Sequence, residues 1–319
     1  MALRPTFVIS LDTELVWGSF DIVSPATFAA WYPDMRTVIR GILDALVEVE
    51  MAATWAVVGH LFLPSCSPGP DGAAHPEHPR PHLSWHPGDW FGDDPCTDRA
   101  RDPLWYGDDI VDMLLAAPVA QEVGSHSFAH IPYGDPGCTA DVVEADLTAC
   151  AKLAAQRGLT LRSFVFPRNS EGHHAALAEH GFAAYRGVDR TWFEAFPGQI
   201  SRAARLVDQA VPLAPPVSAP TETLPGLWNI PGSMLLIGRR GARRVVPVPA
   251  TVAKAKAGMA RAVREGKVFH LWFHPFNLAA DRERSLAMLR AILGEAARLR
   301  DSGVLDVRTM GDLATAMSA

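Results

Sequence analysis

The sequence has few cysteines and lacks the segments typical of export or membrane insertion. Four cysteines occur among 319 residues, and none forms a C-x-x-C pair, which argues against a zinc ribbon or a thioredoxin-like motif. No run of about 18 apolar residues predicts a membrane-spanning helix. The N-terminus lacks the charged and apolar regions of a signal peptide. We therefore expect reduced thiols, a cytoplasmic location and no membrane partner.

Clusters of positive charge are also scarce. The chain has 29 Lys and Arg against 35 Asp and Glu, a formal net charge of −6. Its densest basic segment is the RRGARR stretch at 239–244, so a nucleic-acid partner is not expected. There are no internal repeats. A hydrophobic content of 48% with 20% charged residues is typical of a soluble globular protein with a large core. The oligomeric state stays open, and a homo-oligomer is compatible with the sequence.

Apolar strand-like segments alternate with amphipathic helical ones. Expected strands cover residues 6–11, 53–58, 122–124, 163–166, 182–185, 268–273 and 304–309. Expected helices cover residues 37–49, 109–115, 140–157, 175–180, 249–265 and 281–302. Such alternation predicts an α/β protein with a mainly parallel sheet, open or closed into a barrel. We expect a single domain over residues 1–319.

Two stretches interrupt this rhythm, at about 65–108 and 207–248. The first is rich in Pro, Gly, His and Asp, and both lack periodicity, so we interpret them as loop insertions. Loops of this length are usually functional or disordered. Three tryptophans in the first, Trp85, Trp90 and Trp105, favour an ordered lid whose rings either stack on a sugar or simply pack within the loop.

Polar residues gather where the expected strands end. The segment GSHSFAH at 124–130 places His126 and His130 four residues apart, a spacing that puts two side chains on one face of a helical turn. Asp12 and Glu14 follow the first strand, and alternate residues of an extended chain share a face. A His₂-carboxylate set with open positions is typical of catalytic zinc. Read individually, the histidines could be satisfied by hydrogen bonds, and the acids could cap a helix.

Two further strand ends carry candidate residues. In FPRN at 166–169, Arg168 could bind a carboxylate through two hydrogen bonds or form an ordinary surface ion pair. In FHLWFHP at 269–275, His274 lies at the strand end and suits general acid chemistry. His270 is interpreted as a core or supporting residue.

Together these segments resemble the polysaccharide deacetylase family, also called the NodB homology domain or carbohydrate esterase family 4. SLDTE at 10–14 resembles the first motif, HSFAH at 126–130 the metal motif, FPR at 166–168 the arginine motif, and LWFH at 271–274 the last motif. The resemblance covers most of the chain in motif order. It implies a distorted (β/α)7-type barrel with long active-site loops, and a metal-dependent amidohydrolase that removes an N-acetyl group by hydrolysing a linear amide.

The resemblance also implies roles for individual residues. Glu14, His126 and His130 would hold a divalent ion, expected to be Zn²⁺, with Co²⁺, Ni²⁺, Mn²⁺ or Fe²⁺ as alternatives. The remaining roles are catalytic: Asp12 as base, Arg168 as its ion-pair partner and His274 as acid.

The sequence departs from the family pattern in two places. Thr13 stands where the usual motif has its second aspartate, so the metal role passes to Glu14. No clear aspartate–tryptophan motif orients His274, and Asp189 near Trp192 is the nearest substitute.

The expected substrate is a small or nucleotide-linked N-acetylated sugar. Candidate substrate-binding residues are Trp85, Trp90, Trp105, Asn169 and Trp228. Two alternatives remain: a hydrolase of cyclic amides or imides on the same scaffold, and a catalytically silent carbohydrate-binding protein.

Overall fold

A single sheet organises the chain in the computed structural model, which describes residues 3–189, 208, 211 and 213–319. Its strands are β1 (Thr6–Thr13), β2 (Thr54–Val57), β3 (Glu122–Ser125), β4 (Ser163–Val165), β5 (Ala184–Arg186), β6 (Thr221–Leu224), β7 (Leu227–Asn229), β8 (Met234–Leu235), β9 (Val268–Phe273) and β10 (Asp306–Arg308). The strand order is β6-β7-β5-β4-β3-β2-β1-β9-β8, and β10 pairs with the first half of β1.

The sheet is parallel except at one hairpin. β6 and β7 pair antiparallel, whereas the other strand pairs are parallel. Within the described residues no pairing joins the outer strands β8 and β6, so the sheet curls without closing. The expected distorted (β/α) barrel is confirmed in this open form.

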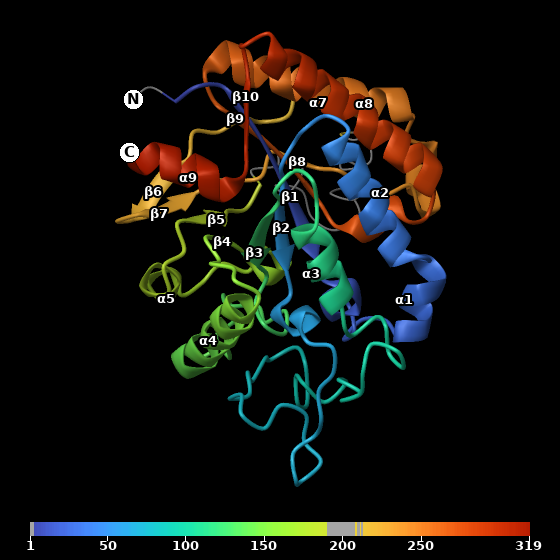
Figure 1. Cartoon of the computed structure of the whole chain (residues 1–319), viewed down its shortest axis with the longest axis vertical. Coiled ribbons are helices and arrows are strands. Elements are labelled where there is room, and N and C mark those ends of the chain that lie inside the picture. The colour runs from blue at the N-terminus through green and yellow to red at the C-terminus, as the bar shows by residue number, and fades with distance from the viewer. Residues whose placement is uncertain (1–2, 190–207, 209–210, 212) are drawn as a thin grey trace.

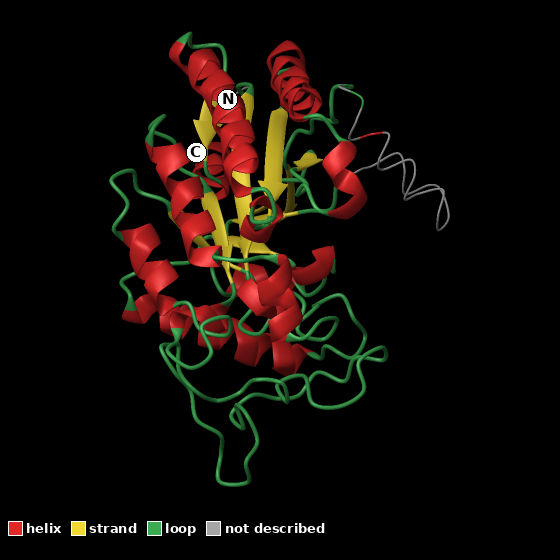
Figure 2. Ribbon diagram, turned by 90° about the vertical axis from the view of Figure 1, so that its right-hand side faces the viewer, coloured by secondary structure: helices red, strands yellow, loops and turns green. Residues whose placement is uncertain are grey.

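Helices cover the outside of the curled sheet (Figures 1 and 2). They are α1 (Pro25–Trp31), α2 (Met35–Val47), α3 (Asp108–Leu115), α4 (Ala140–Gln156), α5 (His174–Glu179), α7 (Val248–Glu265) and α8 (Arg282–Asp301), whereas α9 (Met310–Ser318) lies on the other face of the sheet. In α2, Val38, Ile39 and Ile42 recur at helical spacing and are buried. α7 ends where Gly266 adopts a left-handed conformation, with φ of 64°. Among the described helices, none combines the length and apolar character that crossing a membrane requires.

The two faces of the sheet bury different residues. In β1, Phe7, Ile9 and Leu11 point toward the helix-covered core, whereas Val8 belongs to a second apolar cluster. That second cluster includes Met310 and Leu313 of α9, so α9 fills the inside of the curl near the beginning of β1.

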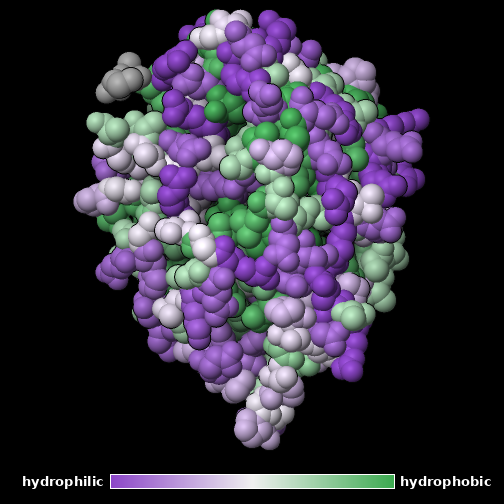
Figure 3. Space-filling model, in the orientation of Figure 1, coloured by the Kyte–Doolittle hydropathy of each residue, from purple (hydrophilic) through white to green (hydrophobic). Residues whose placement is uncertain are grey.

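The two irregular stretches differ in the structure. Between residues 65 and 107 no helix or strand forms, and this long connection extends beyond α3 and α4 at the lower end of the molecule (Figure 1). The expectation of a plain loop at 207–248 is wrong between residues 221 and 235, where β6, β7 and β8 form; residues 207, 209–210 and 212 lie outside the described part. Hydrophilic residues cover most of the face in Figure 3, with hydrophobic ones gathered near its centre.

Candidate active site

The inside of the curled sheet changes from apolar to polar toward the strand ends. Val8 packs against α9, and Ser10 and Asp12, two and four residues further along β1, point to the same face. β9 has the same progression, from Val268 through His270 to the position of His274 just beyond the strand. Because parallel strands end at one edge of a sheet, the residues that follow β1, β3, β5 and β9 meet there.

Glu14, His126 and His130 form a compact buried group at this edge. The Oε2 atom of Glu14 lies 3.2 Å from Nε2 of His126 and 3.1 Å from Nε2 of His130. The three side chains are at most 4% exposed, and their three ligand atoms lie within 4.8 Å of one another. The structure therefore brings together the three residues expected to bind metal.

The turn that carries the two histidines is not helical. β3 ends at Ser125, and Ser127 and His130 have left-handed φ values of 64° and 56°. The expected helical turn is thus corrected, although the two rings still converge, with centroids 4.9 Å apart. Left-handed backbone at non-glycine residues persists where the surroundings hold it in place.

Asp146 of α4 holds this turn. Its carboxylate accepts hydrogen bonds from the Ser127 hydroxyl at 2.8 Å, the Phe128 backbone N–H at 2.8 Å and the Tyr133 hydroxyl at 2.7 Å. The Ser127 hydroxyl in turn accepts from the backbone N–H of Ile131 at 2.9 Å. Asp146 is fully buried inside the protein, and the sequence offers no motif that would have singled it out.

The donor set fits a divalent transition metal. Nδ1 of His126 lies 2.8 Å from the carbonyl oxygen of Val165; donation there leaves the Nε2 lone pair facing Glu14. Nδ1 of His130 is buried, and no described residue forms a hydrogen bond with it. Burial lowers the pKa of His130, which favours the neutral form that ligates metals. Two imidazoles and one carboxylate are the ligand type of catalytic zinc sites with an open position.

Asp12 is buried and doubly bound by Arg186, at the end of β5. The guanidinium donates to Oδ1 at 2.6 Å and to Oδ2 at 2.7 Å. Burial alone would raise the pKa of Asp12, but the Arg186 charge and hydrogen bonds outweigh it, so the pKa lies below its ordinary value. Asp12 is therefore ionised at neutral pH, as a base must be.

The expected pairing of Arg168 with Asp12 is wrong. The Arg168 guanidinium donates instead to Asp21 at 2.6 Å and lies 4.6 Å from the centroid of the exposed Trp85 ring. Arg168 has a left-handed φ of 57° in the turn after β4. Its side chain therefore points away from Asp12 and toward Asp21 and Trp85, which together with Arg168 we call the rim of the site. Arg186 takes the inner position. It ends β5, the strand next to β4, and its side chain points to the face of the sheet that carries Asp12.

A second layer of contacts fixes Arg186. It donates to the Ser10 hydroxyl at 3.1 Å, and that hydroxyl lies 2.8 Å from Nε2 of His270. The guanidinium also lies 4.1 Å from the centroid of the Trp272 ring. Burial, then the Arg186 charge, lower the pKa of His270 to about 3. The interpretation of His270 as a buried supporting residue is confirmed.

His274 faces both carboxylates from just beyond β9. Its Nε2 lies 3.6 Å from Oδ2 of Asp12 and 3.6 Å from Oε1 of Glu14, and its side chain is 22% exposed. The ring stacks on Phe276, with centroids 4.6 Å apart. Asp189 accepts a hydrogen bond at 2.6 Å from the indole of Trp272; Trp192 lies outside the described residues. Asp189 thus holds the Trp272 ring, whose centroid lies 4.1 Å from the Arg186 guanidinium and 6.0 Å from the His274 ring centroid.

The predicted substrate-binding residues separate into different environments. Asn169 lies beside the site, with its Oδ1 atom 3.5 Å from Arg186, and Trp85 is 44% exposed at the rim. Trp90 and Trp105 are 1% and 3% exposed, so the idea that their rings stack on a sugar is wrong. Trp228 donates to Ser318 of α9, and the structure does not bring it to the metal group.

Comparisons with known proteins support the fold. No family model matches the sequence, and no curated protein matches it. A protein of known structure from Mycobacterium smegmatis, assigned to the polysaccharide deacetylases, aligns over 99% of this chain and 91% of its own, with a TM-score of 0.62 and 14% identity. One from Pseudomonas aeruginosa PAO1 with the same assignment aligns over 97% and 89%, with a TM-score of 0.56 and 12% identity.

A further structural neighbour has a different named activity. The Puue allantoinase aligns over 97% of this chain and 88% of its own, with a TM-score of 0.56 and 12% identity. At these identities the likeness establishes a polysaccharide-deacetylase fold for this chain. The activity has to be argued from the site.

Proposed function

We propose that this protein is a metal-dependent hydrolase that removes an N-acetyl group from an amino sugar or a sugar-containing small molecule. One observation carries the proposal. Oδ2 of Asp12 lies 3.6 Å from Nε2 of His274, directly beside the buried group of Glu14, His126 and His130. A base, an acid and a metal-ligand set in one place are what amide hydrolysis requires. The named activity of two structural neighbours supports the same reaction.

Glu14, His126 and His130 would hold the ion, for which we propose Zn²⁺. When bound, it supplies Lewis acidity to the amide carbonyl and to the attacking water. The other steps belong to side chains of the protein. Asp12 is ionised and its oxygens retain lone pairs beyond those used by Arg186, so it accepts the proton of the attacking water.

Arg186 and His274 complete the reaction. The two hydrogen bonds from Arg186 fix the plane of the Asp12 carboxylate and keep it charged. His274 is the partly exposed member of the group, so it can reach a leaving nitrogen on the solvent side. It donates the proton that allows the amine to depart.

The substrate class in this proposal is a small or nucleotide-linked sugar. The exposed Trp85 ring, beside Arg168 at the rim, offers an aromatic face for a sugar. The four cysteines are free thiols, which fits a reducing compartment such as the cytosol. We therefore place the substrate among intracellular N-acetylated sugars.

A second candidate, opening of a cyclic amide or imide, is favoured by the structural similarity to the allantoinase. The same base, acid and ligand set would serve that reaction. A screen of the zinc-loaded protein separates the two. N-acetylglucosamine and a nucleotide-linked N-acetyl sugar are compared with allantoin and a cyclic imide, and acetate release or ring opening is measured.

The proposal predicts acetate and a free amine from at least one N-acetyl sugar, and none of either with Asp12→Asn. Ring opening without acetate release would transfer the function to the second candidate. Sugar binding without turnover, unchanged in Asp12→Asn, would identify a silent binding protein and overturn both.

A further inference from the structure

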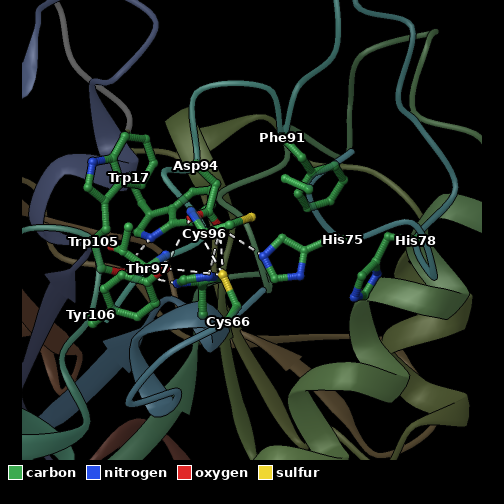
Figure 4. Close-up of polar contacts among 12 residues, drawn as sticks. Trp17, Cys66, His75, His78, Phe91, Asp94, Cys96, Thr97, Trp105 and Tyr106 are labelled. Atoms are coloured by element: carbon green, nitrogen blue, oxygen red, sulfur yellow. Dashed lines mark hydrogen bonds and ion pairs between the residues drawn. The ribbon is translucent and has the colours of Figure 1, made fainter. Parts of the chain in front are cut away.

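A second group of metal-ligating side chains lies beneath the long connection after β2. His60 belongs to the short 3₁₀ helix Gly59–Phe62, and Cys66, His75 and Asp94 come from the connection itself. Figure 4 shows Cys66, His75 and Asp94 pointing toward one another. None of these four residues belongs to the candidate active site.

The ligand atoms of this group converge on one carboxylate oxygen. Oδ2 of Asp94 lies 2.8 Å from Nε2 of His60, 2.8 Å from Nε2 of His75 and 3.6 Å from Sγ of Cys66. All four ligand atoms lie within 4.8 Å of one another. Ligands of a tetrahedral zinc ion are about 3.3–3.6 Å apart, so the two nitrogen–oxygen separations need to widen by only about 0.5 Å.

The other polar atoms of these residues are already engaged by the protein. Nδ1 of His60 lies 3.1 Å from the Trp105 carbonyl oxygen, and Nδ1 of His75 lies 3.2 Å from the Glu77 carboxylate. Oδ1 of Asp94 accepts from the backbone N–H of Cys96 at 2.9 Å. Metal-bound histidines characteristically donate their second nitrogen to a carbonyl or carboxylate in this way. One ligand atom per residue faces the centre, where Sγ of Cys66 also lies 3.1 Å from the Tyr106 hydroxyl.

One of those central atoms lacks a well-aligned hydrogen bond. Nε2 of His60 is buried and contacts Asp94 at 2.8 Å outside good hydrogen-bond alignment, and the described part of the chain offers it no other partner. The His60 side chain is 0% exposed. Buried polar atoms are normally well hydrogen-bonded in native proteins, and an ion between His60 and Asp94 would satisfy both groups.

We propose that His60, Cys66, His75 and Asp94 form a second metal site, which binds Zn²⁺ in a structural role. Imidazole, thiolate and carboxylate ligands around one centre favour zinc over the hard ions Mg²⁺ and Ca²⁺. Four protein ligands leave no open position, which distinguishes this closed site from the three-ligand group at Glu14.

The site joins the long connection to the turn that carries His126 and His130. The backbone N–H of His60 donates to the Phe128 carbonyl at 2.8 Å, and the Trp90 indole donates to the Ala129 carbonyl at 2.8 Å. His78 stacks on Phe128, with ring centroids 4.5 Å apart. An ion at His60 would therefore fasten a segment that lacks helices and strands, and would brace the catalytic turn from behind.

Cobalt distinguishes the two sites, because the group at Glu14 contains no sulfur. We would titrate the metal-free, full-length His126→Ala/His130→Ala variant with Co²⁺ and record the thiolate-to-cobalt charge-transfer band in the near ultraviolet. The matched comparison is Cys66→Ser against Cys96→Ser in the same background. Cys96 neighbours the group but is not one of the four ligands.

The proposal predicts one bound equivalent and a charge-transfer band in the double variant and with Cys96→Ser. It predicts loss of the band and at least a tenfold weaker affinity with Cys66→Ser. His75→Gln, which leaves both thiols intact, should weaken Co²⁺ binding comparably. Circular dichroism confirms that each variant is folded. Absence of the band, its persistence with Cys66→Ser, or a Cys66–Cys96 disulfide in purified protein without zinc would overturn the proposal.

Discussion

Arg186 donates two hydrogen bonds, 2.6 and 2.7 Å long, to the two carboxylate oxygens of Asp12 inside the protein. Both side chains are at most 4% exposed, so water does not compete for these hydrogen bonds. It joins β5 to β1 across the inside of the curled sheet. Arg186 is consequently the residue that holds the catalytic carboxylate in its orientation.

We expect Arg186→Lys to reduce kcat by about 10²-fold while metal content stays unchanged. Lysine keeps the positive charge but cannot make the paired hydrogen bonds, and small displacements of a catalytic group can cost this much. The matched control is Arg168→Lys, which changes the arginine at the rim. Steady-state kinetics on the substrate found by the screen provides the measurement. An equal or larger kcat loss in the control would mean that Arg168 orients the base after all.

Asp146 should act on the site through the turn at 126–130. In Asp146→Ala, three buried donors lose their acceptor, and we expect the free energy of unfolding to fall by about 3 kcal/mol. Metal affinity should fall about tenfold, since a support of the ligands is lost. Urea unfolding and metal titration measure the two effects. Glu144→Ala, on the exposed side of the same helix, should change neither. Unaltered metal affinity in Asp146→Ala would remove its positioning role.

Two tryptophans of the long connection after β2 should respond differently to truncation. Trp85 is 44% exposed, and Trp90 is 1% exposed. Trp90→Ala should lower the free energy of unfolding by about 3–5 kcal/mol because it opens a cavity. Trp85→Ala should leave stability nearly unchanged and raise KM for a sugar substrate several-fold. If KM is also unchanged in Trp85→Ala, the rim does not contact the substrate.

Acid should weaken the link between α2 and the start of α3. Arg36 donates to both oxygens of Asp109 at 2.6 and 3.0 Å. Burial alone would raise the pKa of Asp109. The hydrogen bonds and charge of Arg36 have the larger effect, so the pKa lies below its ordinary value. A carboxylate whose pKa is lowered by folding stabilises the protein above its unfolded pKa of about 3.9, and this contribution is lost as pH falls.

Asp109→Asn should therefore cost about 1 kcal/mol of unfolding free energy at pH 6, and much less at pH 3. Urea unfolding of both proteins at each pH provides the comparison. A difference that stays constant or grows toward pH 3 would contradict the sign of this shift.

Much of the fold could be predicted because hydrophobic periodicity records which segments are buried. The strands at β1, β2, β4 and β9 lie close to their expected positions. The short strands β6, β7 and β8 were missed, because two to four residues carry too little pattern to be distinguished from a loop.

The candidate site was predicted where residues end apolar strands. Asp12, Glu14, His126 and His274 follow that rule, and Arg186 follows it too, at the end of β5. The arginine was assigned to Arg168 instead because sequence motifs do not reveal the left-handed turn that directs Arg168 to the rim. His60, Cys66, His75 and Asp94 could not be recognised, because their irregular spacing lies in a segment without periodicity.

The central claim is that Glu14, His126 and His130 hold the ion on which hydrolysis depends. The most direct test measures acetate release by the full-length protein before chelation, after chelation and after one equivalent of Zn²⁺ is restored. Wild type and Glu14→Gln are compared on the same N-acetyl sugar. We predict that chelation abolishes release in wild type, that zinc restores it, and that Glu14→Gln stays inactive. Full acetate release by the chelated protein, or by zinc-loaded Glu14→Gln, would contradict the account.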